Sequence, residues 1–244
     1  MSDGDGGDAI RLAKRVAALK GCSRSEAERY IEGGWVRVDG QIAEDPATRV
    51  TPAQSVTLDA GATLLADGPV TLLLYKPAGD AQGLHLLTAD RRSSRDTRPI
   101  RPLRKHFQGL TALAPLPAAA AGLVVFTQDW RVQRKLTEDA DVLEHEIMAD
   151  VANAVDELTL QKLRQGLQDG ARMPAPVRVS ISSVAAGRTR LRFAFKGMAP
   201  AQLGALCTAA GLQLQSFTRQ RIGRVALAGL SEGQWRYLDA SERF

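Results

Sequence analysis

The sequence predicts an α+β protein: a small N-terminal module of two helices and short strands, then a larger domain with a mostly antiparallel mixed sheet flanked by helices. Three observations predict this class. The 244 residues suffice for one large domain and one small one. Apolar residues recur at helical spacing within residues 10–31. After residue 70, strand-like and helix-like patterns mix without a strict βαβ alternation.

The small module is expected to span residues 9–58, after a Gly- and Asp-rich tail at 1–8 that is expected to be disordered. Its first helix, over residues 10–20, ends at Gly21. Ser23 lies three residues before Glu26, the arrangement of a capping box, and predicts the start of a second helix. Strands are expected at 35–38 and 55–58, and Asp39-Gly40 predicts a tight hairpin turn between strands.

The larger domain is expected to span residues 70–244, after a linker at 59–69. Uninterrupted apolar runs predict buried strands at 70–74 and 122–126. Alternating patterns predict half-exposed strands at 177–181 and 191–195. Helices are expected at 155–167 and 201–210. Strands and helices therefore share one domain rather than separate halves of the chain.

Composition narrows the class of partner. The net charge of +5 and the pI of about 9.5 favour a polyanion. Cys22 and Cys207 are too few for a disulfide framework or a zinc site, and three His residues without metal-ligand spacing predict no structural metal. The polar start is unlike a signal peptide, and no apolar run reaches the roughly 18 residues of a membrane span. We expect a cytoplasmic protein without a membrane partner, and favour a monomer.

A basic face is predicted on the small module. Arg11, Lys14 and Arg15 fall at i, i+3 and i+4 and share one helix face. Arg24 follows at the second helix start, where free backbone N–H groups can also meet a phosphate. The predicted contacts to the RNA backbone are Arg11, Lys14, Arg15, Lys20, Ser23, Arg24 and Arg29. On charge alone, a merely solvated surface is an equal alternative.

The stretch RLAKRVAALKGCSRSEAERYIEGGWVRVDGQ, followed by PATRV and SVTLD, resembles the alpha-L RNA-binding motif. This motif occurs in a small-subunit ribosomal protein, in rRNA pseudouridine synthases and in some tRNA synthetases. The resemblance covers about residues 9–58 and implies that the module binds structured RNA, ribosomal RNA above all.

Several pieces of the larger domain resemble the bacterial rRNA pseudouridine synthases that carry this same module. They are LLYKPAG, GLVVFTQD, RVQRKLTEDADVLEHEIMADV, DGARMPAPVRV and RQRIGRVALAGLSEGQWRYL, in the family's order. The resemblance implies a pseudouridine synthase fold and an enzyme that isomerises uridine without a cofactor. Such an enzyme flips the target base out of the RNA into a pocket.

The catalytic positions of that family are replaced here. The family has an Asp in a motif like Gly-Arg-Leu-Asp-x-x-Thr/Ser-x-Gly-Leu, and aligning its end on Gly122-Leu123 puts Pro117 at the Asp position and Pro115 at the Arg. Proline has no ionisable group. The family Tyr position falls on Ile147, and the segment KGMAPAQLGAL holds one Lys and no Arg where the family is rich in RNA-contacting residues.

Other cations of the family's cleft are retained. Lys76 ends the first strand of the domain, and Arg219 and Arg221 match the basic residues before Ile-Gly, one of which contacts the reacting nucleotide in the family. They could equally survive as salt-bridge partners in an emptied pocket. Residues 91–105 hold seven basic residues against Asp96 alone, and Arg91, Arg92 and Arg95 are expected to track phosphates from a flexible loop, unless the loop is merely solvated.

Three hypotheses follow. The first is a catalytically inactive homologue, a pseudoenzyme that binds structured ribosomal RNA. The second is an active synthase with a relocated carboxylate, for which Asp129 is the candidate. The third is a protein-interaction scaffold that no longer needs RNA.

Overall fold

The computed structural model describes residues 9–64, 68–98, 100–152, 154–166, 176–197 and 199–244. The chain divides into two compact units: Met1–Gly68 with Pro99–Gln108, and Pro69–Arg98 with Gly109–Phe244. The tail predicted to be disordered, residues 1–8, lies outside the described residues. Each unit is described separately below.

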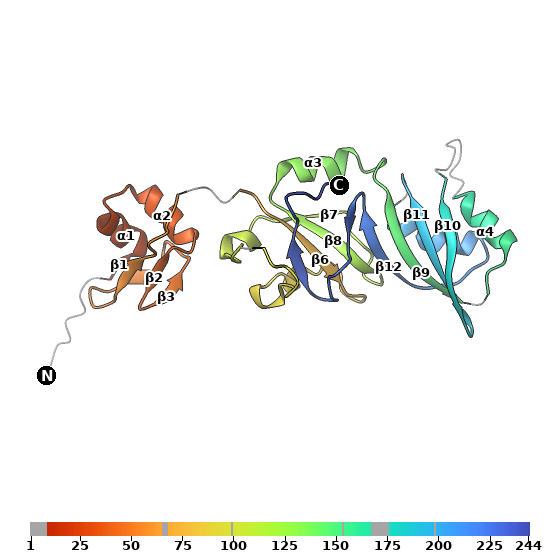
Figure 1. Ribbon diagram of the computed structural model, residues 1–244, viewed down its shortest axis with the longest axis horizontal. Coiled ribbons are helices and arrows are strands. Elements are labelled where there is room, and N and C mark those ends of the chain that lie inside the picture. The colour runs from red at the N-terminus through yellow and green to blue at the C-terminus, as the bar shows by residue number, and fades with distance from the viewer. Residues whose placement is uncertain (1–8, 65–67, 99, 153, 167–175, 198) are drawn as a thin grey trace. The chain divides into compact units, whose positions relative to one another are not determined.

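The first unit combines the two predicted helices with short strands (Figure 1). Its helices are α1 (Leu12–Lys20) and α2 (Arg24–Glu32). One sheet has the order β3-β2-β5, and a second pairs β1 with β4. The strands are β1 (Ile10–Arg11), β2 (Val36–Val38), β3 (Gln41–Ala43), β4 (Arg49–Val50) and β5 (Val56–Leu58). The two predicted helices and the strands at 36–38 and 56–58 are present, but Ile10 and Arg11, expected to begin the first helix, form a short strand because they pair with Val50 and Arg49.

Local chemistry fixes the ends of these elements. Ser23 accepts a hydrogen bond from the Glu26 N–H, and the Glu26 carboxylate accepts one from the Ser23 N–H, so the predicted capping box is present. Asp39 and Gly40 both have positive φ, of 51° and 79°, as a primed hairpin turn requires. Packing extends past Leu58, because Ala62 and Leu64 lie against the unit's apolar core.

The second unit is built on a nine-stranded mixed sheet among the described residues, with the main order β10-β11-β9-β12-β8-β6-β14 (Figure 1). Adjacent strands pair antiparallel except β12 and β8, which are parallel. The strands are β6 (Thr71–Lys76), β7 (Thr111–Leu113), β8 (Ala121–Thr127), β9 (His145–Ala152), β10 (Arg178–Ala185), β11 (Arg188–Phe195), β12 (Leu214–Ile222), β13 (Val225–Ala226) and β14 (Trp235–Tyr237). The predicted mostly antiparallel mixed sheet is therefore confirmed.

Helices cover this sheet as an α+β fold requires. Helix α3 (Trp130–Glu138) packs Leu136 into a core with Leu73 and Val125. Helices α4 (Glu157–Arg164) and α5 (Leu203–Ala209) contact β10 and β12 respectively. Short 3-10 turns of this unit lie at Leu84–Leu86, Ala89–Arg91 and Pro200–Gln202, whereas the one at Arg104–Phe107 belongs to the first unit. The helices predicted at 155–167 and 201–210 correspond to α4 and to the Pro200 turn with α5.

Gly122 permits the parallel pairing at the centre of the sheet. It has φ of +118°, and a Cβ at this position would overlap the backbone N and O of Arg219. Only glycine combines that conformation with so close an approach of two backbones. The Gly-Leu pair that follows the alanine-rich turn therefore sets where β8 meets β12.

Candidate functional site

The first unit contains a basic groove. A hollow of about 480 Å³ is lined, among the described residues, by four cationic side chains and three small or apolar residues and by no acidic one: Arg11, Lys14, Arg24, Arg49, Ala9, Ile10 and Ala17. The four cationic residues are all exposed. A concave surface with several cations suits a polyanion backbone, because each cation can replace a condensed counterion at a phosphate.

Pairing of β1 with β4 brings two of these cations together. Arg11 lies directly across from Arg49, and the Arg49 Nη1 donates to the Ala9 carbonyl at 2.8 Å. Lys14 is one turn along α1, and Arg24 begins α2. Sequence reasoning missed Arg49 because it lies 38 residues after Arg11 and only strand pairing brings the two together. Its place in the matched PATRV segment was the available signal.

The remaining predicted contacts of this unit lie outside the groove lining. Arg15 is half-buried, and its Nε has no hydrogen-bond partner within the described residues. Ser23 uses its hydroxyl in the capping box. Lys20 and Arg29 are exposed, and Arg29 donates to the Leu64 carbonyl. For all four of these residues, contact with RNA stays a prediction.

The unit has a second hollow of opposite character. It measures about 720 Å³, and its lining includes Asp39, Glu44 and Asp45, with Arg104 as the cation. Acidic side chains repel a phosphate backbone. Of the two hollows, only the basic groove therefore suits RNA.

In the second unit, one row of residues crosses the centre of the sheet. Lys76 pairs with Gly122, Gly122 with Arg219, and Arg219 with Ile147. Residues that pair directly across neighbouring strands project to the same face. The sheet thus brings the predicted Lys76, Arg219 and Ile147 together, although 143 residues separate the first from the second.

Arg219 is fully buried, with 0% of its surface exposed. Its Nε donates to the Leu123 carbonyl at 2.8 Å, and its Nη2 donates to the carbonyls of Leu123 and Ala114. Its Nη1 has no hydrogen-bond partner within the described residues. Burial lowers the pKa of Arg219 to about 9, which leaves the guanidinium charged at neutral pH. Backbone carbonyls, rather than a carboxylate, surround this charge.

Lys76 is held in the same way. Its Nζ donates to the carbonyls of Asp80, Pro77 and Ala118, at 2.7, 2.9 and 3.3 Å. Burial lowers the pKa of Lys76; the charge of Arg219 adds to this effect, whereas Asp80 opposes it. Pro117 lies beside Ala118 in the loop between β7 and β8, and its carbonyl accepts from the Ala120 N–H at 3.0 Å. Both cations therefore bind the backbone of the loop that carries Pro117.

Arg221 lies on the opposite face of the sheet from Arg219. It pairs across the strands with Glu146, which precedes Ile147 on β9 and so projects to the other side. Its Nη2 lies 2.6 Å from Glu144 and 3.1 Å from Glu146. For Arg221, the alternative of a salt-bridge partner is the one that the structure supports.

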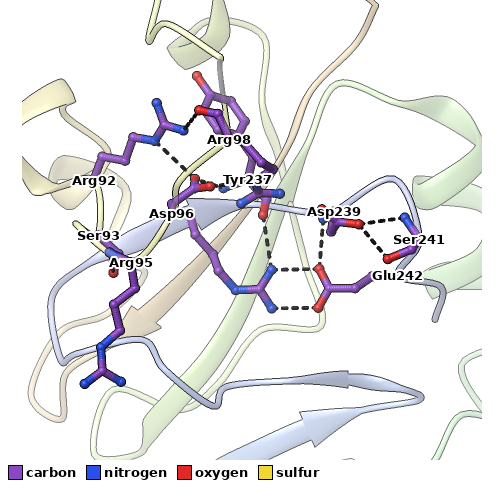
Figure 2. A network of polar contacts seen from close by, with 10 residues as sticks. Arg92, Ser93, Arg95, Asp96, Arg98, Tyr237, Asp239, Ser241 and Glu242 are labelled. Carbon is purple, nitrogen blue, oxygen red and sulfur yellow. Dashed lines mark hydrogen bonds and ion pairs between the residues drawn. The ribbon is translucent and has the colours of Figure 1, made fainter.

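The basic stretch at 91–98 is anchored to the fold rather than flexible as expected (Figure 2). Asp96, whose side chain is 1% exposed, accepts from Arg92 at 3.1 Å, from Arg98 at 2.5 Å and from the Tyr237 N–H at 3.1 Å. Arg92 also lies over the Tyr237 ring, 5.1 Å from its centroid. The expectation failed because one buried carboxylate organises two arginines. Arg91 and Arg95 remain exposed, and their contact with RNA stays a prediction.

Other kinds of site find little support within the described part of the chain. No group of three or more His, Cys, Asp or Glu side chains there is placed to hold a metal ion. No helix among those same residues has the length and apolar character needed to cross a bilayer.

Comparison with known proteins identifies the family of the first unit and of the whole chain. The S4 domain family matches residues 10–56. An RNA pseudouridine synthase of Mycobacterium leprae, itself uncharacterised, is 30% identical over 96% of this chain and 90% of its own length. The chain belongs to the RNA pseudouridine synthase family.

Two further likenesses in the RNA pseudouridine synthase family span the whole chain. Ribosomal small subunit pseudouridine synthase A of Escherichia coli is 26% identical over 96% of this chain and 98% of its own. A crystal structure of a pseudouridylate synthase superimposes with a TM-score of 0.58 at 20% identity, covering 95% of this chain and 97% of that one. The first unit is thus an S4 RNA-binding domain, and the second has the pseudouridine synthase fold.

Proposed function

We propose that this family member is a catalytically inactive homologue that binds structured ribosomal RNA through its S4 domain. The supporting observation is the environment of Arg219. Among the described residues its guanidinium meets only the carbonyls of Leu123 and Ala114, and the sequence offers Pro117 where the family has its catalytic Asp. The reaction needs a carboxylate at the flipped nucleotide as nucleophile or base, and proline supplies neither.

The other positions of the row support the same proposal. Ile147 is fully buried at the family Tyr position and carries no hydroxyl. Lys76, with 1% of its surface exposed, is occupied by three carbonyls. Lys76 and Arg219, the cations that would contact a nucleotide, instead donate hydrogen bonds to the backbone of the loop between β7 and β8.

A relocated carboxylate is the alternative, and its candidate, Asp129, is poorly placed, as is Glu146 near the centre of the sheet. Asp129 follows the far end of β8, seven residues from Gly122, or about 23 Å at strand rise. Its carboxylate caps α3 by accepting the Arg131 N–H at 2.8 Å. Glu146 lies on the other face, bound to Arg192 and Arg221. For Asp129 or Glu146 to reach the face of the sheet that carries Arg219, the strands would have to move.

The test combines binding and chemistry on one sample. Purified protein is mixed with transcribed ribosomal RNA fragments, followed by gel shift over a range of salt and by mass spectrometry for pseudouridine. The four cations of the groove alone account for a slope of about −3 to −4 in log affinity against log salt, so we expect a slope at least that steep, with no pseudouridine formed. The Escherichia coli synthase on the same fragments controls the assay.

Two results would change the proposal. Pseudouridine above the protein-free background would overturn inactivity, and loss of that product in Asp129→Asn would identify the relocated acid. Charge reversal at Arg11, Lys14 and Arg15 tests the scaffold alternative. If association with ribosomal particles in cells survives this change intact, RNA binding is not the role of the protein.

A further inference from the structure

An arginine-covered surface lies on the second unit, away from the row of Arg219. Strands β10, β11, β9 and β12 form one end of the sheet (Figure 1). Within the described residues, the ion pairs on the face that carries Glu146 join eight charged side chains: Arg178, Arg188, Arg190, Arg192, Arg221, Glu144, Glu146 and Asp150. We call this set the arginine face.

Cross-strand register places these side chains on one side. Arg190 pairs with Asp150, which pairs with Ser216, and Ser183 pairs with Arg190 on β10. Two residues along β11, Arg192 pairs with Ser180. Alternation along each strand puts Leu191 and Phe193 on the opposite, buried face. Arginines and serine hydroxyls therefore share one surface.

The two charge signs lie at different depths. Asp150 and Glu146 side chains are only 12% and 16% exposed, whereas those of Arg190 and Arg192 are 46% and 57% exposed. Arg178, at 74%, is the most open. The carboxylates sit close to the sheet and the guanidinium groups lie above them, so a partner approaching this face meets arginine first.

The carboxylates fix the guanidinium groups in place. Asp150 accepts from Arg190 Nε and Nη2 at 2.8 and 3.0 Å, and Glu146 accepts from Arg192 Nε and Nη2 at 3.0 and 2.9 Å. Each bidentate pair uses two of the five N–H donors of a guanidinium. The other three stay available to a second acceptor, and the arginine loses little further side-chain freedom when it binds one.

The charge is not balanced. Among the residues that the structure describes there, five arginines lie with three carboxylates, which leaves an excess of two positive charges. Hydrogen bonds, from Arg190 to Asp150 and from Arg192 to Glu146, lower the pKa of both carboxyl groups and keep them ionised at neutral pH. Ion pairing for solubility alone needs no such excess. A surface of arginine and serine with a net positive charge complements phosphate oxygens.

We propose that the arginine face binds the phosphate backbone of RNA as a second contact surface in addition to the S4 groove. The proposal rests on the proposed function, that the chain binds RNA, and adds where the second unit holds it. Arg188, Arg190 and Arg192 recur at every second position, about 6.8 Å apart along β11. Such a row follows an extended backbone and does not read base sequence.

The first test removes the charges of the three arginines of β11. The full-length variant with Arg188→Gln, Arg190→Gln and Arg192→Gln should bind a ribosomal RNA fragment about tenfold more weakly, with a salt slope shallower by about 1 to 2. The matched control changes three other exposed arginines, Arg131, Arg134 and Arg164, to Gln and should bind like the parent protein. Thermal unfolding of both variants checks that the fold is kept.

A second measurement needs no substitution. Phenylglyoxal labelling of the parent protein, read by mass spectrometry, should show Arg188, Arg190 and Arg192 protected when the RNA is added, while Arg134 labels equally with and without RNA. This result stands even where the triple variant fails to fold.

The outcomes separate the two proposals. If the parent protein does not bind RNA, the proposed function and this inference fall together. If it binds, and substitutions in the S4 groove abolish binding while the row variant keeps parental affinity and its arginines are not protected, only the arginine face is disproved.

Discussion

The S4 groove and the row of Arg219 use the same residue types in opposite ways. Arg11, Lys14 and Arg49 line an open hollow in which the described part of the chain places no acidic side chain. Lys76 and Arg219 are buried against backbone carbonyls of the chain itself. A basic residue can bind an external phosphate only when its donors face solvent. The comparison shows that retained cations are evidence for a binding site only after their partners are known.

The largest expected effect tests whether Arg219 stabilises the fold rather than binding a ligand. Replacing it by Met should remove about 3 kcal/mol from the free energy of unfolding, because the carbonyls of Leu123 and Ala114 lose their donor in a buried site. Urea unfolding measures the loss. A stability change below about 1 kcal/mol would show that this guanidinium is open to ligands instead. Arg49→Gln, the control in the groove, should leave stability unchanged.

Charge reversal in the S4 groove tests whether the exposed cations there bind RNA. The Arg11→Glu, Lys14→Glu, Arg24→Glu variant should bind ribosomal RNA about 100-fold more weakly at low salt, because favourable phosphate contacts become repulsive. Filter binding measures this. The matched control, Arg131→Glu, Arg134→Glu, Arg164→Glu, changes the net charge by the same amount at exposed arginines of the second unit, with an expected loss below about threefold. Equal losses in both would mean that overall charge, not the groove, decides affinity.

The anchored basic stretch gives a pH-dependent prediction. Burial alone would raise the pKa of Asp96, but hydrogen bonds from Arg98, Arg92 and the Tyr237 N–H outweigh it and hold the pKa at about 2. A carboxyl group with a lowered folded-state pKa stabilises the fold above its unfolded pKa of about 3.9, and this stabilisation is lost as the pH falls toward 2.

Asp96→Asn should therefore cost about 2 kcal/mol at pH 7, and the difference between parent and variant should shrink between about pH 4 and pH 2. Denaturant unfolding at several pH values measures it. If the difference in stability between parent and variant stays constant down to pH 2, the contribution of Asp96 to stability does not come from its negative charge.

The smallest expected effect separates stability from binding within the S4 domain. Ser23→Ala removes the capping box of α2 and should cost about 1 kcal/mol of stability. RNA affinity at a temperature where both proteins are folded should change less than twofold, since the hydroxyl is already used by Glu26. A larger loss of affinity would return Ser23 to the RNA contacts.

Short-range features were predictable from the sequence because their causes are local. The capping box depends on two side chains three residues apart, and the hairpin turn on Asp39 and Gly40. The central strands β9 and β12 were not predicted, since β9 alternates buried residues with acids whose partners, mostly arginines, lie on other strands. Their pairing is a long-range property.

The sequence by itself determined the family, the mixed α+β class, the absence of an acid at Pro117 and the presence of the basic residues. Only the tertiary structure decided which cations stay open. Strand pairing over long separations buried Arg219 beneath the loop of Ala114, placed Arg49 beside Arg11, and spread the arginines of β11 over one face. Burial and partners are set by what packs around a side chain, and residue type alone does not encode that.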